Sequence, residues 1–205
     1  MNILLRDARA GDETQVVRLF RDSYGTLRKS LGGAHPDEAV DRVLSLPDEE
    51  LFEIYLSHGK MIIAEVDGEL AGFSSFTSGR FDRLLQSSYF NLIYVKASFQ
   101  GGKGGVSVGR LLNESRLRTV KEMGFRKVYG YASPESVGFE SKFGARYYPA
   151  HDRYFPFDGT TYKYYEVELR PSALNRIPVE ALLFGLFVHW SSFRHGLSKR
   201  LMRVK

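Results

Sequence analysis

The chain of 205 residues contains no cysteine, and this absence limits its chemistry. Disulfide bonds and thiolate catalysis are excluded, and a reducing compartment such as the cytoplasm is the expectation. No apolar run reaches the roughly 18–20 residues that cross a bilayer, and charge appears too early for a signal peptide. The five histidines are scattered without ligand spacing, so we expect no metal site.

The net charge of +5 is unevenly distributed along the chain. Residues 171–205 hold six Lys or Arg and one Glu, a balance of +5, so residues 1–170 balance to zero. The larger part therefore has no basic composition that indicates nucleic-acid binding, and we expect no nucleic-acid partner. We expect one main domain over residues 1–170 and a separate extension over residues 171–205.

The most informative stretch runs from Tyr89 to Gly124. An apolar, β-branched and aromatic run over Phe90–Val95 predicts a buried strand, and apolar spacing from about Ser107 predicts a helix that ends at Gly124. Five glycines lie between Gly101 and Gly109, around Lys103. A strand, a glycine loop and a helix N-terminus form a phosphate-binding arrangement, because backbone N–H groups and the helix dipole attract anions. A purely structural turn is the alternative, since neither standard nucleotide fingerprint is matched.

The rest of the first 170 residues alternates between strand and helix patterns. Asp67-Gly68 between two alternating runs is a strong hairpin signal. Strands are expected over residues 3–6, 61–66, 70–76, 127–132, 146–148 and 162–169, and helices from about residue 12, near 37–45 and 48–57, and over 134–142.

Two segments in this order carry a resemblance to a known family. The strand that ends at Val95 is followed by a four-residue break and a loop that opens at Gln100. Downstream, Ser133–Gly144 is similar to the pattern Asn-x-x-Ala-x-x-Phe-Tyr-x-Lys-x-Gly. Residues 3–169 thus resemble the GNAT superfamily of acyl-CoA-dependent N-acyltransferases.

The resemblance implies an α/β fold with a mixed twisted sheet flanked by helices, here followed by a C-terminal helical extension. It implies transfer of an acyl group, most simply acetyl, from CoA to an amine on a small molecule or amino sugar. Acetyl-CoA or another acyl-CoA is then the donor, without a metal. The residues implied in CoA binding are Val95, Gln100, Gly101, Gly102, Lys103, Gly104, Gly105, Val108, Gly109, Arg110, Ser133 and Ser136.

The sequence departs from the family pattern at its catalytic positions. Glu140 stands where the family has its general-acid tyrosine, and Leu92 stands where many members carry a glutamate. An ionised carboxylate has no proton to donate. Tyr94 and Glu140 are the catalytic candidates, against packing for Tyr94 and a solvent-facing helix position for Glu140. His35, in the expected acceptor loop, could act as a base, although a solvated loop histidine is the default.

These departures leave two further functions open. One is a non-catalytic acyl-CoA-binding module. The other is a membrane-associated acyltransferase with a longer acyl donor or a lipid-linked acceptor, which the extension favours. The helix expected in the extension begins at Pro178, is apolar over residues 179–193 and ends in a basic cluster. Residues 178–205 therefore suit a membrane interface or a protein groove, with packing back onto the domain as the alternative. A homodimer is compatible with these features.

Overall fold

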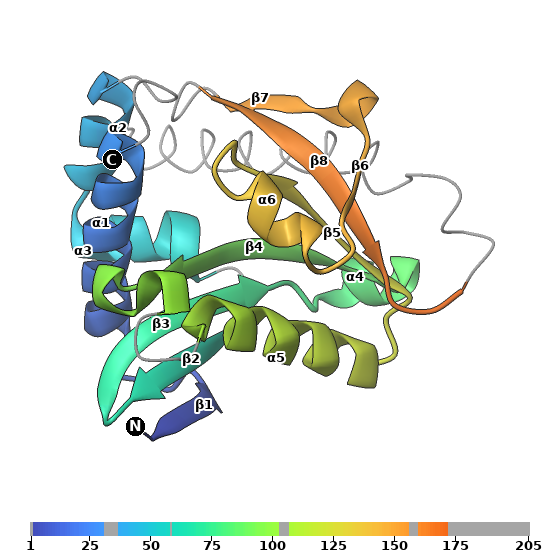
Figure 1. Cartoon of the computed structure of the whole chain (residues 1–205), viewed down its shortest axis with the longest axis horizontal. Helices are drawn as coiled ribbons and strands as arrows, with labels where there is room; N and C mark the ends of the chain where they lie inside the picture. The colour runs from blue at the N-terminus through green and yellow to red at the C-terminus, as the bar shows by residue number, and fades with distance from the viewer. Residues whose placement is uncertain (1, 31–36, 58, 103–106, 156–159, 172–205) are drawn as a thin grey trace, which may run out of the picture. The chain divides into compact units, whose positions relative to one another are not determined.

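The computed structural model describes residues 2–30, 37–57, 59–102, 107–155 and 160–171 (Figure 1). The chain divides into two compact units, Met1–Arg170 and Pro171–Lys205, and the described residues belong almost wholly to the first. Within these residues, no helix is long and apolar enough to cross a membrane. His35 and the expected helix from Pro178 lie outside the described residues.

A single sheet runs through the first unit. Its strands are β1 (Ile3–Asp7), β2 (Lys60–Val66), β3 (Glu69–Phe76), β4 (Ser87–Val95), β5 (Lys127–Ala132), β6 (Arg146–Tyr147), β7 (Arg153–Phe155) and β8 (Thr160–Glu168). The strand order is β1-β2-β3-β4-β5-β8-β6, and β7 also pairs with β8. Every described pair is antiparallel except β4 with β5, which is parallel. The mixed sheet that the sequence predicts is therefore confirmed.

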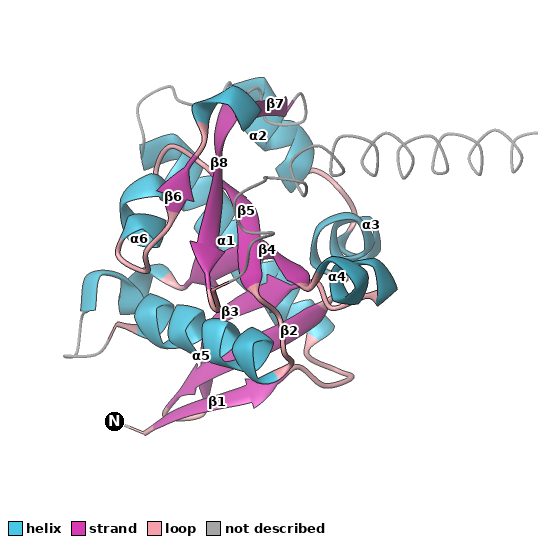
Figure 2. Cartoon of the chain, turned by 90° about the vertical axis from the view of Figure 1, so that its right-hand side faces the viewer, coloured by secondary structure: helices cyan, strands magenta, loops and turns pink. Residues whose placement is uncertain are grey.

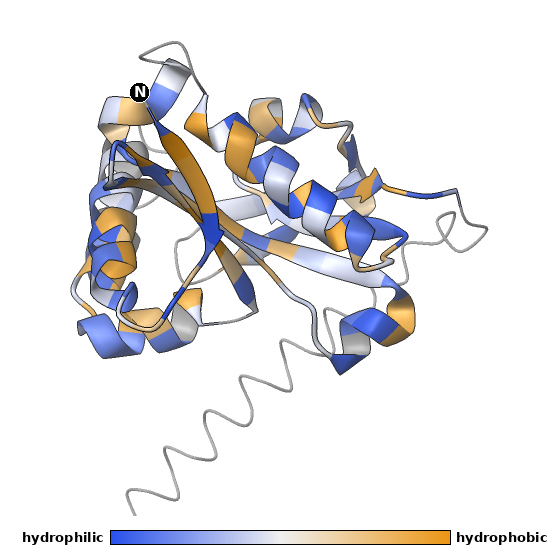
Figure 3. Ribbon diagram, turned by 90° about the horizontal axis from the view of Figure 1, so that it is seen from below, coloured by the Kyte–Doolittle hydropathy of each residue, from blue (hydrophilic) through white to orange (hydrophobic). Residues whose placement is uncertain are grey.

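Helices cover both faces of this sheet (Figure 2). They are α1 (Glu13–Ser30), α2 (Asp37–Leu44), α3 (Asp48–Leu51), α4 (Arg80–Leu85), α5 (Val108–Glu122) and α6 (Val137–Ser141), with short turns of other helix types at Phe52–Leu56, Ala97–Gly102 and Pro149–His151. Helix α5 packs on β2, β3 and β4, whereas α1 packs on β3 and β4. Apolar and polar stripes alternate around the helices, as expected for elements that cover a core with one side (Figure 3).

The period-2 pattern of β2 shows how the strands serve two cores. Ile62 and Ala64 belong to the core beneath α5, while Ile63 belongs to the core beneath α1. Successive strand side chains point to opposite faces, so a strand that is apolar at nearly every position is buried on both. The central strands are therefore fixed from both sides, which holds the ends of β4 and β5 in place.

The local turn signals of the sequence are confirmed. Asp67 and Gly68 both have positive φ, 50° and 83°, as a two-residue hairpin turn of type I′ requires. Ser107 is the N-cap of α5, and its Oγ accepts a hydrogen bond from Arg110 N at 3.3 Å.

The expected helix over residues 134–142 is shorter than predicted. Ser136 N donates to Ser133 O at 2.9 Å, which forms a turn, and regular helix begins only at Val137. Helix α4 and strand β7 were not expected from the sequence at all. Both are short, and short elements carry too few periods of an apolar pattern to be recognised.

Candidate active site

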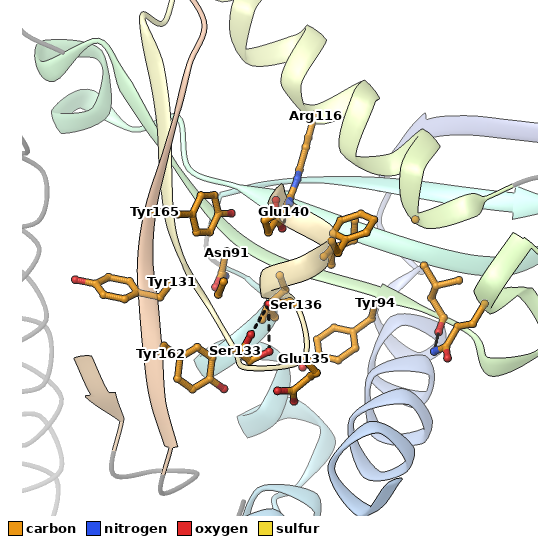
Figure 4. Close-up of a pocket in the computed structure, with 17 residues that line it drawn as sticks. Asn91, Tyr94, Arg116, Tyr131, Ser133, Glu135, Ser136, Glu140, Tyr162 and Tyr165 are labelled. Atoms are coloured by element: carbon orange, nitrogen blue, oxygen red, sulfur yellow. Dashed lines mark hydrogen bonds and ion pairs between the residues drawn. The ribbon is translucent and has the colours of Figure 1, made fainter. Parts of the chain in front are cut away.

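The candidate site lies where the two parallel strands separate. Strands β4 and β5 pair only over Ser87–Phe90 and Lys127–Gly130. Beyond this point β4 pairs with β3 alone, and β5 continues along β8. The divergence leaves an opening of about 270 Å³ in the middle of the sheet. Side chains from β4, β5, α5, α6 and β8 line it (Figure 4).

The end of β4 turns backbone donors toward this opening. Leu92 N donates to Ser75 Oγ at 3.3 Å and Lys96 N to Ala71 O at 2.9 Å, both on the β3 side. Because N–H directions alternate along a strand, the N–H of Val95 points to the opposite side, toward the opening. A backbone N–H at this place can donate to the oxygen of a bound carbonyl group.

The glycine loop is tied to the same strand end. Gln100 Nε2 donates to the carbonyl oxygen of Val95 at 2.7 Å, and Gly101 and Gly102 have φ of 70° and 73°. Such positive φ values suit glycine, because a Cβ would be strained there. Lys103, Gly104 and Gly105, which the sequence analysis places in the phosphate loop, lie outside the described residues.

Gly109 faces the opening from the first turn of α5. A Cβ built there would lie 3.5 Å from Val95 Cγ2 and 3.6 Å from the Phe139 ring, so any longer side chain would enter the space between β4 and α6. Because Gly109 has no side chain, a ligand can approach the backbone of α5 closely at this place, which is called the cradle below. The two neighbouring residues that are also expected to bind CoA are placed differently. Val108 is buried in the core, and Arg110 pairs with Glu114 at the surface, with 2.7 Å between Nε and Oε1.

Ser133 and Ser136 line the opening from the turn after β5. The Oγ of Ser136 accepts from Ser133 Oγ, 3.2 Å away, and donates to the carbonyl oxygen of Ser133 at 3.1 Å. The two hydroxyls thus hold the turn in shape. Of the CoA-binding residues expected from the sequence, the structure brings Val95, Gln100, Gly109, Ser133 and Ser136 together around the opening.

Tyr94 lines the opening but also packs in the core beneath α1. Its ring meets Phe20 edge-on at 5.1 Å between centroids and lies 5.8 Å from Phe73. This packing is the alternative that the sequence analysis kept beside catalysis. A catalytic role for Tyr94 stays a prediction.

Glu140 does not face solvent, so the expectation of a solvent-facing position was wrong. Its side chain is buried, and Oε1 accepts from Arg116 Nη2 at 2.8 Å. Arg116 is buried as well, donates through Nε to Asn113 and places Cζ 4.0 Å from the Phe90 ring centroid. The carboxylate thus balances a buried guanidinium, an arrangement that favours a structural role over proton donation.

Several residues of the opening were not singled out in the sequence. They are Asn91, Arg116, Tyr131, Glu135, Tyr162 and Tyr165. Arg116 could have been noticed, because it lies four residues from both Leu112 and Val120 and thus inside the buried stripe of α5. Tyr131 and Tyr165 become neighbours only through the pairing of β5 with β8, which no local pattern in the sequence predicts.

Two phenols of the opening are held protonated. Burial raises the pKa of Tyr165 well above its ordinary value, and the negative charge of Glu140 raises it further. Burial also raises the pKa of Tyr131. Neutral phenols donate hydrogen bonds and cannot act as bases near pH 7. Among the described residues, no group of three or more acidic, histidine or cysteine side chains could hold a metal ion.

Known structures share this architecture. The chain is similar to PaiA N-acetyltransferase from Thermoplasma acidophilum in complex with coenzyme A, with a TM-score of 0.56, 18% identity and coverage of 82% of this chain and 99% of the other. It is similar to a GCN5-related N-acetyltransferase from Rhodopseudomonas palustris, with a TM-score of 0.61, 18% identity and coverage of 82% and 96%. It is also similar to the ribosomal-protein-S18-alanine N-acetyltransferase from Escherichia coli, with a TM-score of 0.59, 9% identity and coverage of 84% of this chain and 97% of the other.

No protein-family model matches the sequence, and no curated protein matches it significantly. At identities of 9–18% the structural likeness shows the fold. The described domain has the GNAT fold, and the fold expected from the two sequence segments is confirmed. Two of the similar structures hold coenzyme A, the PaiA N-acetyltransferase and an N-acetylglutamate synthase from Neisseria gonorrhoeae that also holds N-acetyl-glutamate.

Proposed function

We propose that the chain transfers an acyl group, most simply acetyl, from acyl-CoA to an amine of a small molecule or amino sugar. The observation that carries this proposal is the opening between β4 and β5, beside which α5 begins. The alternation of N–H directions along β4 directs the Val95 N–H toward it. An acyl thioester is a ligand whose carbonyl group needs a donor and whose phosphates need a helix N-terminus.

The residues present fit such a ligand. Gly109 leaves room between β4 and α6, and the first turn of α5 offers backbone N–H groups to an anion. Val95 N–H would hold the thioester carbonyl oxygen. The chain contributes mainly by orientation, because donors fixed in a strand and a helix need no rearrangement during reaction.

Tyr165 is the phenol that best suits a hydrogen bond to the leaving sulfur. It lines the opening from β8, and its raised pKa keeps the hydroxyl protonated. Tyr165 lies near Glu140, and Glu140 is the residue that stands where the family pattern has a tyrosine. In this scheme a different strand supplies the hydroxyl, and Glu140 is left to pair with Arg116.

A non-catalytic acyl-CoA-binding module is the second candidate. It is favoured by Leu92 at the opening where many members of the family carry a glutamate, and by the engagement of Glu140 with Arg116. Both functions predict that CoA binds. They differ in whether the thioester is consumed when amines are supplied.

The test is CoA binding combined with thioester consumption. Acetyl-CoA, CoA and desulfo-CoA should each raise the melting temperature of the full chain, and acetyl-CoA should be consumed when a panel of primary amines is added. Binding without consumption by any amine would favour the binding module. An unchanged melting curve at millimolar CoA would refute both functions.

A substitution at Gly109 locates the binding site. Gly109→Leu should abolish the CoA-induced rise in melting temperature, because its side chain would fill the cradle beside Val95 and Phe139. The matched control is Gly138→Leu in α6, where an added Cβ meets nothing within 4 Å. Normal CoA binding by the Gly109 variant would place the ligand elsewhere.

A further inference from the structure

Tyr165 has two cross-strand neighbours of very different size. On β8 it is paired with Gly130 of β5 on one side and with Tyr147 of β6 on the other. Directly paired residues of antiparallel strands carry their side chains on the same face, with Cβ atoms about 4.5–5.5 Å apart. The Tyr147 ring occupies the β6 side, with 6.0 Å between the two ring centroids. Because Gly130 has no side chain, the phenol of Tyr165 has its space on the β5 side.

The phenol lies directly on the backbone of Gly130. A Cβ built at Gly130 would lie 2.8 Å from the hydroxyl oxygen of Tyr165 and 2.9 Å from Cζ and Cε1 of its ring. These distances are shorter than van der Waals contact, so any side chain at this position requires the ring or the strand to move. Gly130 is not among the glycines with positive φ. The glycine is therefore required by the ring of Tyr165 and not by the conformation of the backbone.

Gly130 is also the residue at which the opening begins. It is the last residue of β5 that pairs with β4, where it is opposite Phe90. The next residue, Tyr131, lines the opening. A phenol that crosses β5 at Gly130 therefore reaches the opening, which explains why Tyr165 lines it although β8 and β4 are not neighbours in the sheet.

The hydroxyl of Tyr165 is neutral and is not engaged within the described part of the chain. Tyr165 is only 3% exposed, and its hydroxyl forms no hydrogen bond with any residue that the structure describes. The hydroxyl is drawn on the side of Glu140 (Figure 4), whose negative charge adds to the effect of burial in raising the pKa of Tyr165. A buried hydroxyl without a partner is unfavourable, and an acceptor atom of a ligand in the opening would satisfy it.

We propose that Gly130 is a positioning residue: its missing side chain lets the phenol of Tyr165 cross β5 and place its hydroxyl in the opening between β4 and β5. The inference rests on the proposed acyl transfer for the purpose of this placement. In that reaction a neutral amine forms the C–N bond, the C–S bond breaks with its electron pair on sulfur, and one amine proton passes to solvent. The phenol keeps its proton and donates a hydrogen bond to the negative charge that develops on sulfur.

Crystal structures test the placement without any turnover. The Tyr165 hydroxyl should lie at the opening in the wild-type chain, and Gly130→Ala should displace it, because the added methyl group would overlap the ring. The matched control is Gly138→Ala in α6, where an added Cβ meets nothing within 4 Å and the ring should stay in place. If Gly130→Ala does not fold, Tyr147→Ala makes the same test from the other side. It frees space beside β6 and should let the ring move away from β5, whereas Tyr147→Phe keeps the ring and should not.

A double-mutant cycle tests the purpose of the placement. Tyr165→Phe and Gly130→Ala should each lower kcat for acetyl-CoA consumption about 10- to 100-fold, the effect of losing or misplacing one hydrogen bond to an ionised group. The double variant should show no further loss, since Gly130 acts through the Tyr165 hydroxyl. The KM for acetyl-CoA and the CoA-induced rise in melting temperature should be kept in all three variants. A merely structural glycine would lower stability and leave kcat per folded molecule unchanged.

Three results would overturn the inference: a Tyr165 hydroxyl that stays in place in Gly130→Ala, an unchanged kcat in that variant, or a full further loss when Gly130→Ala is added to Tyr165→Phe. These results are separable from failure of the proposed function. If CoA leaves the wild-type melting curve unchanged, or if no amine leads to consumption of acetyl-CoA, the acyl-transfer proposal falls. The crystal structures then still decide whether Gly130 places the phenol.

Discussion

The buried pair of Arg116 and Glu140 can be tested directly, because its structural and catalytic roles predict different outcomes. The two side chains are 1% and 5% exposed, with 2.8 Å between Nη2 and Oε1. Glu140→Ala removes the carboxylate and leaves the guanidinium buried beside Asn113 and the Phe90 ring. Breaking a buried pair in this way costs about 3–5 kcal/mol, so we expect that loss in the free energy of unfolding.

Further variants isolate the charge. Glu140→Gln keeps the size and one acceptor and should cost about 1–3 kcal/mol, the price of a weakened hydrogen bond to a charged group. Arg116→Met combined with Glu140→Leu removes both charges and should cost less than Glu140→Ala alone, since no unpaired ion stays buried. Glu140→Tyr would restore the family residue, and it should also destabilise the fold because Arg116 loses its anion.

Urea denaturation measures these free energies, and turnover with CoA binding is measured on the same samples. A structural pair predicts that stability falls in Glu140→Gln and that turnover per folded molecule is kept. The catalytic alternative predicts lost turnover at unchanged stability and CoA affinity. The structural reasoning is refuted if Glu140→Ala costs less than about 1 kcal/mol, or if Glu140→Tyr raises turnover.

Three further predictions follow from other parts of the chain. Arg6 lowers the pKa of Asp12 from 3.8 to about 2, so the pair stabilises the fold above about pH 4 and this contribution disappears as pH falls toward 2. Asp12→Asn should accordingly cost about 1–2 kcal/mol at pH 7, allowing for solvent screening, and the difference from wild type in urea denaturation should vanish near pH 2. Tyr165→Phe should lower turnover without changing CoA affinity, and an unchanged rate would remove it as donor to the leaving sulfur. Deletion after Arg170 should leave a folded domain that binds CoA, whereas anionic vesicles should bind the full chain and release it at high salt; loss of folding would instead assign residues 171–205 to the domain.

Much of the fold follows from signals that are local in sequence. Asp67-Gly68 predicts the hairpin because its turn type needs two residues with positive φ, and the structure has both. The strand at Phe90–Val95 and the helix to Gly124 are predicted because apolar periodicity and a terminal glycine act within one element. The neighbourhood of β8 with β5 had no such local signal.

The candidate site was predictable only in part, for the same physical reason. Val95, Gly109 and Ser133 lie at the ends of locally encoded elements, and the family resemblance implies that they share one site. Arg116 and Glu140 are 24 positions apart, and their pairing depends on how α6 packs against α5. A glutamate on a short helix is most often solvated. Only the tertiary contact makes Glu140 a buried partner.

The opening itself is a consequence of backbone pairing and not of any one side chain. Parallel pairing stops at Phe90 and Gly130, and the residues that follow on each strand bond only to the outer neighbours. Leu92 and Glu140 stand where the family pattern has a glutamate and a tyrosine. These two differences therefore leave the direction of the Val95 backbone N–H unchanged. Proton-carrying groups can then change position around a fixed opening. In this chain a protonated phenol, Tyr165, lies toward the core beneath α5, while Glu135 is on the side of Tyr94 and Tyr162.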